Sequence, residues 1–465
     1  MDRQGSANPP IPGRTWSIAA VTGAGAFMAM LDSTVANLAL ESIRVDFATT
    51  LPVVQWVSTG YLVALAVSLP AAAWLGGRYG YGRIWAISLA FFVMASAFCA
   101  VATSPLMLIA ARLLQGLAGG LMVPAGQAVI GAIAGGRQLG RIMGFLGLVI
   151  ALGPAIGPAV GGLLLDVVSW RWLFWINVPF GVMALLAAIR VVPEGRRHPE
   201  RRLDVSGLLL ISLGLPLVLY GMTEIGANGL VPLAFVSGSL GALLIVAFVL
   251  RTLHTRYPLI DLHLLASKRF SAATAITGFT GANMYAGLLL LPLYLQIVMG
   301  LGPGSTGICL LVMGLGTALA LPVAGSLTDR YGAGPISLTG AGLLLISTIP
   351  FLFPAALTDG VLAFALAARG AGLALALMPA VAAAYTAARA REMGDATTLV
   401  NIVQRVFGAI GAVGVVIILQ QVSGLTTVEA YIWAFAALGV LSLLTLATAM
   451  VLQRQTSLSQ KHVVR

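Results

Sequence analysis

Residues 17–40 read SIAAVTGAGAFMAMLDSTVANLAL, an apolar run that contains one ionisable side chain, Asp32. A helix of about 20 apolar residues spans the hydrocarbon core of a bilayer, so this run is long enough to cross a membrane. The chain as a whole is as apolar as this run suggests: 59% of its 465 residues are hydrophobic, 9% are charged and the mean hydropathy is +0.98. So few charges exclude a soluble enzyme, and so much apolar surface excludes a disordered chain. The sequence predicts an all-α integral membrane protein.

Further apolar runs predict fourteen membrane-spanning helices. They lie near residues 17–40, 53–75, 84–102, 105–127, 139–165, 172–192, 204–223, 230–250, 271–299, 306–327, 335–354, 360–386, 400–421 and 430–452. Many of the 55 glycines fall inside these runs. Small residues there allow neighbouring helices to approach closely within the membrane.

The basic residues outside these runs fall almost entirely on one side of the membrane. With a cytoplasmic N-terminus, only Arg44 and Arg171 among them lie outside. The positive-inside rule therefore predicts a multi-pass protein of the cell inner membrane with both termini in the cytoplasm. This distribution also explains the net charge of +11 without a nucleic-acid partner, since basic loops bind anionic lipid. Histidines and cysteines lack metal-ligand spacing, so no metal site is expected.

A weak internal repeat relates the first six predicted helices to the last six. Segment 75–80 reads LGGRYG and segment 327–332 reads LTDRYG. Two such halves are the plan of a rocking transporter with its binding site between them. The predicted divisions are a cytoplasmic tail at 1–16, an N-terminal half at 17–192, two inserted helices with their loops at 193–265, a C-terminal half at 266–453 and a cytoplasmic tail at 454–465.

Asp32 is the one acidic residue that falls clearly inside the predicted hydrocarbon region. A charged side chain there costs about 2.5–3.5 kcal/mol even on insertion scales, and folding alone gives no reason to accept that cost. Arg112 is its predicted partner, because both residues lie about 10–12 Å below the outer surface when depth is counted along their helices. Gln115, one helical turn further on, can hydrogen-bond in the same place.

Two interpretations of this pair stay open. Burial favours the neutral form of a carboxyl group and a nearby cation favours the charged form, so a carboxyl group under both influences can take up and release a proton. On this interpretation Asp32 is the proton-coupling site, Arg112 is a fixed counter-ion, and the proton is the coupling ion with no cofactor. On the other, the pair is a static contact between helices. Arg369 and Arg405 lie nearer the ends of their predicted helices, which favours structural roles for both.

A substrate cavity should combine apolar walls with a few polar groups. The candidates on the predicted pore-lining helices are Phe27, Met28, Asn37, Trp56, Tyr61, Gln127, Asn283, Tyr285, Tyr294 and Gln296. Because other buried acids are nearly absent, the cavity is predicted to hold little negative charge. Either a cationic substrate shares Asp32 with the proton, or the substrate is neutral or anionic.

Five motifs follow one another along the chain. They are LDSTVANLAL at 31–40, RLLQG at 112–116, a glycine and proline pattern within 144–162, WRWLFWINVP at 170–179 and PLIDL at 258–262. Together they resemble the major facilitator superfamily, and within it the fourteen-helix branch of drug:proton antiporters, over essentially residues 15–455. The resemblance implies the major facilitator fold, with two six-helix halves plus two inserted helices.

The resemblance also implies residues for gating and packing. The family's loop after the second helix latches the outward-facing state, but this chain has Gly77 where the family usually carries Asp. The implied latch residues are Arg78 and Gly80 in the first copy, and Asp329 and Arg330 in the second. The family's helix-five motif, which seals the path to the cytosol, corresponds to Gly153, Pro154, Gly157, Pro158 and Gly161. Taken as residues alone, the glycines form a smooth packing ridge and the prolines bend the helix.

We therefore predict a multidrug-type antiporter that exports amphipathic small molecules by alternating access with proton coupling. A dedicated exporter of one endogenous metabolite, such as an antibiotic or siderophore, is the alternative. The chain lacks the Gly-Lys-Ser/Thr of an ATP-binding P-loop, and it lacks the clustered reactive groups of a membrane enzyme. Only the helix-five pattern of the family argues against a proton-linked importer. The predicted partners are the small-molecule substrate and membrane lipid, while an outer-envelope adaptor and the oligomeric state stay open.

Overall fold

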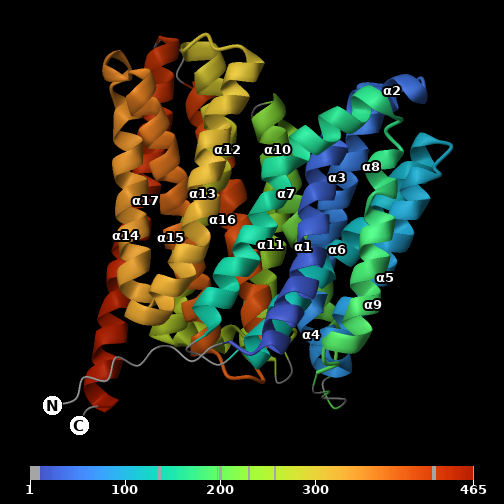
Figure 1. The fold of residues 1–465 in the computed structure, drawn as a ribbon, viewed down its shortest axis with the longest axis vertical. Helices are drawn as coiled ribbons and strands as arrows, with labels where there is room; N and C mark the ends of the chain where they lie inside the picture. Colours follow the sequence, from blue (N-terminus) through green and yellow to red (C-terminus); the bar gives the residue numbers. More distant parts are fainter. Residues whose placement is uncertain are drawn as a thin grey trace.

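The computed structural model describes residues 11–134, 138–195, 197, 200, 202–228, 231–255, 258–421 and 426–463. Within these residues every regular element is a helix, and the helices form one bundle (Figure 1). The side chains of Asn37, Pro154 and Pro158, three of the predicted site residues, lie outside the described set.

Grouped by the predicted divisions of the chain, which stay a prediction, the helices are as follows. The N-terminal half contains α1 (Gly13–Leu38), α2 (Leu40–Asp46), α3 (Leu51–Ser68), α4 (Ala71–Tyr79), α5 (Tyr81–Ala100), α6 (Pro105–Ile133), α7 (Leu139–Val167), α8 (Trp172–Trp175) and α9 (Asn177–Val191). The inserted pair is α10 (Val205–Asn228) and α11 (Pro232–His254). The C-terminal half contains η1 (Leu262–Ala266), α12 (Lys268–Leu293), η2 (Tyr294–Val298), α13 (Pro303–Tyr331), α14 (Ala333–Thr348), η3 (Ile349–Leu352), η4 (Pro354–Ala356), α15 (Asp359–Ala387), α16 (Met393–Gln421) and α17 (Thr427–Val463).

Many of these helices are able to span a membrane. Among the described residues, 11 helices are long and apolar enough, and the bent pair α3–α4 gives up to 12. The two parts of that pair meet at 55°, next to Pro70, which lacks the amide hydrogen that a continuous helix needs. Parts of α7 and α10 form shorter apolar helices, Leu139–Ile150 and Val205–Val218. The chain is therefore a multi-pass, all-α membrane protein, while the count of fourteen spans stays a prediction.

Helix α1 begins and helix α17 ends at the same end of the bundle, which we call the tail end (Figure 1). The opposite end is the far end. Helix lengths place Asp32 towards the far end of α1, since it lies about 28 Å along the helix from Gly13 at a rise of about 1.5 Å per residue.

The two halves share a hydrophobic core at the tail end. One buried cluster combines side chains of both halves, among them Ile142 of α7 and Leu399 of α16. Towards the far end, each half has a cluster of its own: Phe174 belongs to that of the N-terminal half and Phe435 to that of the C-terminal half. This distribution of buried apolar side chains means that the halves are closed against each other at the tail end.

The inserted pair lies against both halves. Helix α10 contacts α3 of the N-terminal half and α16 of the C-terminal half. The Ser212 hydroxyl donates a hydrogen bond of 2.8 Å to the Val67 carbonyl. Helix α11 packs on α10, and its Arg251 side chain donates to the buried Asp204 carboxylate near the start of α10 at 2.9 and 3.0 Å. These contacts join α10 to the rest of the bundle and α11 to α10.

Candidate functional site

Asp32 is almost fully buried, with 3% of its surface exposed. Helices α6 and α9 supply its hydrogen-bonding partners. Arg112 of α6 forms an ion pair with Asp32 through Nη1. Gln115 Nε2 of α6 and Asn177 Nδ2 of α9 donate to Asp32 Oδ1 over 3.0 and 2.9 Å. Both amides also donate to Ser96 Oγ of α5, at 3.2 and 3.1 Å. We call these five residues the N-half polar cluster.

Arg112 is held on several sides. Its Nε donates to the Val57 carbonyl of α3 at 2.9 Å, and its Nη1 also donates to Gln115 Oε1 at 2.7 Å. The guanidinium lies over the Tyr61 ring, 4.3 Å from the centroid. Removing one partner of a buried ion pair typically costs about 3–5 kcal/mol, because the other charge is left uncompensated. The cluster therefore ties α1, α3, α5, α6 and α9 together.

This arrangement permits two charge states. Neutralising the Asp32 carboxylate removes the ion pair, but the Arg112 guanidinium keeps Gln115 Oε1 and the Val57 carbonyl as hydrogen-bond acceptors. A buried polar group that keeps its acceptors avoids the full penalty of desolvation. With a neutral Asp32, Arg112 would thus keep these two hydrogen-bond acceptors but lose its counter-charge.

Sequence reasoning placed Asp32 and Arg112 at one depth, with Gln115 one helical turn further on, and the structure brings the three into contact. It assigned no role to Ser96 or Asn177. Asn177 lies within the motif at 170–179 and is the one amide there, which is the signal that could have identified it. Ser96 is a hydroxyl within an apolar run and carries no comparable signal.

The glycines predicted as a packing ridge contact α1 on either side of Asp32. A β-carbon at Gly153 would lie 2.7 Å from Met30 Cβ, and one at Gly157 would lie 3.0 Å from Thr34 Cγ2. Gly161 faces Val35 and Leu38 in the same way. Glycine thus allows α7 to pack closely against the segment of α1 that carries the acid. Sealing of the cytosolic path by this motif stays a prediction.

Polar contacts reinforce the closure at the tail end. Gln127 of α6 accepts hydrogen bonds through Oε1 from Tyr385 Oη of α15 at 3.2 Å and from Asn401 Nδ2 of α16 at 2.7 Å. These three residues connect the two halves directly. Gln127 was predicted to line a substrate cavity, and here it lies in the closed contact between the halves.

Asp329 makes a second connection between the halves. Its carboxylate, at the end of α13, accepts hydrogen bonds from the backbone amides of Gly140 and Arg141 at the start of α7, at 2.9 and 3.2 Å. It also accepts one from Arg141 Nε at 3.0 Å. A negative charge is stabilised at a helix N-terminus by the exposed amides and the helix dipole. The geometry is suited to the latch that the family resemblance implies, although that role remains a prediction.

The other predicted gating residues lie beside these contacts. Arg78 lies over the rings of Trp74 and Tyr79, each at 5.7 Å. Gly80 ends α4 with φ of 97°, and a β-carbon there would collide with the Glu194 carbonyl. Arg330 lies over the Tyr331 ring at 5.2 Å. No gating role follows from these contacts alone.

The residues predicted to line a substrate cavity fall into different environments. Met28, Tyr61, Asn283 and Tyr294 are buried; Phe27 and Gln127 are half-buried; Trp56, Tyr285 and Gln296 are exposed; and the Asn37 side chain lies outside the described set. Tyr294, for example, packs edge-on against Phe351 and Phe435. The buried residues can contact a substrate only if another conformation exposes them, so the predicted lining stays untested.

The C-terminal half has a polar cluster built like that of the N-terminal half. Arg369 of α15 donates through Nη2 to Asn283 Oδ1 of α12, and through Nη1 to Thr348 Oγ1 of α14 at 3.3 Å. Asn283 Nδ2 donates to Ser442 Oγ of α17 at 2.7 Å. We call these four residues the C-half polar cluster. The contacts are consistent with the structural role predicted for Arg369.

Arg405 lies elsewhere than expected. The apolar run at 400–421 placed it near a helix end, but α16 begins at Met393, because the small and polar residues 393–399 also form helix. Arg405 therefore lies about 18 Å into α16, in the middle of the span. Its side chain is half-buried.

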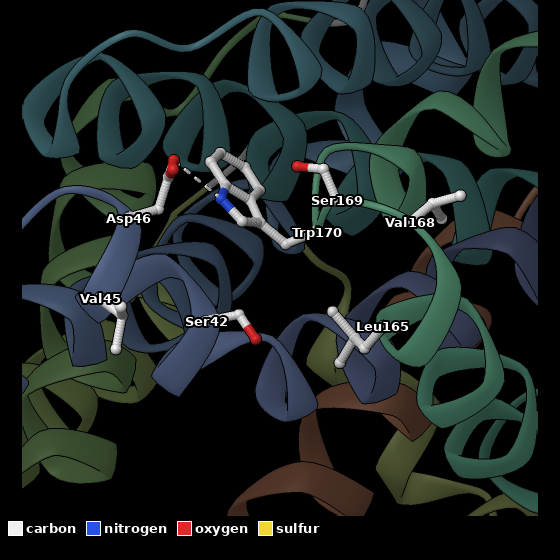
Figure 2. Close-up of a pocket in the computed structure, with 7 residues that line it drawn as sticks. All are labelled: Ser42, Val45, Asp46, Leu165, Val168, Ser169 and Trp170. Carbon is white, nitrogen blue, oxygen red and sulfur yellow. Dashed lines mark hydrogen bonds between the residues drawn. The ribbon is translucent and has the colours of Figure 1, made fainter.

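A pocket of about 490 Å³ opens at the far end of the N-terminal half (Figure 2). Its lining residues are Ser42, Val45, Asp46, Leu165, Val168, Ser169 and Trp170. Trp170 Nε1 donates to Asp46 Oδ2 at 3.2 Å, and Arg171 Nη1 donates to the same oxygen at 2.9 Å. These hydrogen bonds lower the pKa of the Asp46 carboxyl group below its usual range. The pocket lies within one half, so it is separate from the contact between the halves.

Comparison with known proteins gives consistent matches. The family model described as Major Facilitator Superfamily matches residues 22–412 and 277–462. A multidrug resistance protein B homolog of Mycobacterium tuberculosis is 35% identical over 83% of this chain and 72% of its own length. The tetracenomycin C resistance and export protein of Streptomyces glaucescens is 32% identical over 72% of this chain and 64% of its own length. The solved structure of the proton:xylose symporter XylE is 14% identical in sequence. It superposes with a TM-score of 0.65 over 92% of this chain and 94% of XylE.

Proposed function

Because this chain belongs to the Major Facilitator Superfamily, and within it to the drug-efflux branch, we propose that it is a proton-coupled antiporter that exports amphipathic small molecules by alternating access. Membership makes it a membrane transporter rather than an enzyme. The coupling ion, the direction of exchange and the class of substrate are the parts of this proposal that go beyond the family.

The N-half polar cluster carries the proposal. Asp32 is the one acid in the described central part of the spans, and it lies beside a guanidinium that keeps other hydrogen-bond acceptors if the carboxyl group becomes neutral. Neutralising Asp32 weakens its attraction to Arg112 and to the donors on α6 and α9, which hold α1 in place. Binding and release of a proton at Asp32 would thus change how firmly α1 is held within its half.

We infer the side from which the proton arrives from the end at which the halves are closed. We take the tail end as cytoplasmic, and the membrane as the cell inner membrane, because basic residues gather there. The contacts of Asp329 and Gln127 then close the cytoplasmic side, which is the outward-facing state of an alternating-access cycle. In this state Asp32 would load from outside, driven in part by about 2.3 kcal/mol per charge per 100 mV of membrane potential.

A dedicated exporter of one metabolite is the second candidate. The similarity to a tetracenomycin C resistance and export protein favours it, while the similarity to a multidrug resistance protein B homolog favours broad efflux. A susceptibility panel in a pump-deficient host separates the two. Protection against one compound class supports the dedicated exporter, and protection against several supports broad efflux.

The proton site is tested by Asp32→Asn in proteoliposomes that contain a pH-sensitive dye. We expect substrate addition to release protons from the wild type and from the matched control Asp46→Asn, whose acid lies in the exposed pocket at the far end. The Asp32→Asn protein should reconstitute normally but release none. Proton release by Asp32→Asn equal to that of the wild type would refute the assignment.

A further inference from the structure

Arg405 is a cation in the middle of a membrane-spanning helix, and no described residue pairs with its charge. Among the described residues, it takes part in no hydrogen bond, ion pair or ring contact. Arg112 pairs with Asp32, and Arg369 bonds to Asn283 and Thr348. A charged side chain at this depth is costly, and such residues usually mark a substrate or ion pathway.

The side chain of Arg405 is on the face of α16 that is turned towards the other half. Asn401, one helical turn earlier on the same face, donates its hydrogen bond to Gln127 of α6. Arg405 is also one of the charges that act on the Tyr61 phenol of α3, in the N-terminal half. It is therefore positioned between the halves, one turn beyond the polar layer that closes the tail end.

We propose that Arg405 recognises the acidic group of the transported molecule, so that the substrates are amphipathic organic anions such as carboxylates, sulfonates or phenolates. A guanidinium offers five donors in a planar fork that fits such oxygens, often in a bidentate manner. The inference rests on the proposed function and names the charge class of its substrate. In an outward-facing transporter, an anion bound at this depth would lie on the floor formed by Gln127, Tyr385 and Asn401.

The charges of the neighbouring groups favour an anion over a cation. Asp32 is the one acid in the described central part of the spans, and its oxygens are occupied by Arg112, Gln115 and Asn177. A cationic molecule between the halves would meet the charge of Arg405 with no free carboxylate to offset it. An anionic molecule would neutralise that charge.

The test uses two dyes that share one tricyclic scaffold, anionic fluorescein and cationic rhodamine 123. Uptake of each is measured in everted vesicles that carry the wild type, Arg405→Gln or Arg405→Lys. We expect the wild type to accumulate fluorescein, Arg405→Gln to raise the KM for fluorescein about tenfold, and Arg405→Lys to recover part of the loss. The KM for rhodamine 123, if it is transported, should not rise in Arg405→Gln.

The outcomes separate the two proposals. If the wild type transports rhodamine 123 but not fluorescein, or if Arg405→Gln transports fluorescein with an unchanged KM, anion recognition by Arg405 is wrong and export remains. If Arg405→Gln loses both dyes equally, Arg405 has a general structural role and the inference is overturned. If the wild type transports neither dye, nor any compound of a wider panel, the proposed function fails and the inference fails with it.

Discussion

Among the described residues, the two halves of the molecule each bury one arginine, and they differ in the group that faces it. In the N-terminal half the partner on the first helix is the carboxylate of Asp32, whereas in the C-terminal half it is the amide of Asn283. The surrounding positions correspond as well. Ser96 and Thr348 lie on α5 and α14, Arg112 and Arg369 on α6 and α15, and Asn177 and Ser442 on α9 and α17.

This difference shows how one scaffold can serve two purposes. An amide does not take up a proton near neutral pH, so the charge of the C-half polar cluster is fixed. A carboxyl group is titratable, so the proposed protonation of Asp32 would change the charge of the N-half polar cluster. The C-terminal half also shows that a buried arginine with an amide partner is compatible with a folded bundle, which is why we expect Asp32→Asn to fold.

The largest effect should come from Arg112→Gln. This change leaves the Asp32 carboxylate buried without its cation, which costs about 3–5 kcal/mol of folding free energy. We expect a markedly lower unfolding temperature in detergent and loss of substrate-evoked proton release. The double variant Arg112→Gln with Asp32→Asn tests whether the uncompensated carboxylate causes the loss. It should be more stable than Arg112→Gln alone, because it buries no unpaired charge. Equal stability of the two would contradict a buried ion pair.

Arg369→Gln should have a smaller effect on stability and a different one on function. No carboxylate is left without a partner, so the cost is that of the lost hydrogen bonds to Asn283 and Thr348, about 1–3 kcal/mol. The ratio of protons released to substrate exported should match that of the wild type. A changed ratio would show that the C-half polar cluster takes part in coupling, and the contrast between the halves would be wrong.

The glycine contact around Asp32 predicts a moderate effect. A methyl group at Gly153 must displace Met30 on α1, since its carbon would lie 2.7 Å from Met30 Cβ. Overpacking of this kind costs about 1–3 kcal/mol. Gly414, on the corresponding helix α16, has open space around its Cα and supplies the matched control. We expect Gly153→Ala to lower the unfolding temperature and Gly414→Ala to leave it unchanged. Equal unfolding temperatures of the two variants would mean that α7 does not pack tightly on α1.

The smallest effect concerns the exposed ion pair of Asp46 and Arg171. Pairs of this kind contribute about 0.2–1 kcal/mol. Because the pKa of Asp46 is lowered in the folded protein, its contribution is present at neutral pH and is lost as the pH falls below the ordinary value of 3.8. Asp46→Asn should therefore be slightly less stable than the wild type at pH 7, and the difference should shrink as the pH falls from 3.8 through the lowered pKa of Asp46. A difference independent of pH would exclude this explanation.

Depth along a helix could be predicted from the sequence, but rotation about its axis could not. The contact of Asp32 with Arg112 followed from the lengths of the apolar runs, since depth depends only on the rise per residue. Which side a residue faces depends on how the helices pack, and nearly uniform apolar runs carry little information about it. For this reason the proposed cavity mixed buried residues such as Tyr294 with exposed ones such as Gln296.

Helix ends within polar segments were the other source of error. Hydropathy alone began the helix of Arg405 at residue 400, seven residues after Met393, where the structure begins it. Asn177 was missed because an amide hydrogen-bonds equally well in a structural or a functional place. Its importance appears only when α9 is packed beside α1, where it reaches the Asp32 carboxylate at 2.9 Å.

The central claim is that Asp32 changes its protonation state during transport. Infrared difference spectroscopy of the protein in membranes observes this directly, because a protonated carboxyl group has a C=O stretch that a carboxylate lacks. We predict that substrate addition removes such a band from the wild type and that the change is absent from Asp32→Asn. A band change that persists in Asp32→Asn, or none in a wild type that releases protons, would contradict the account.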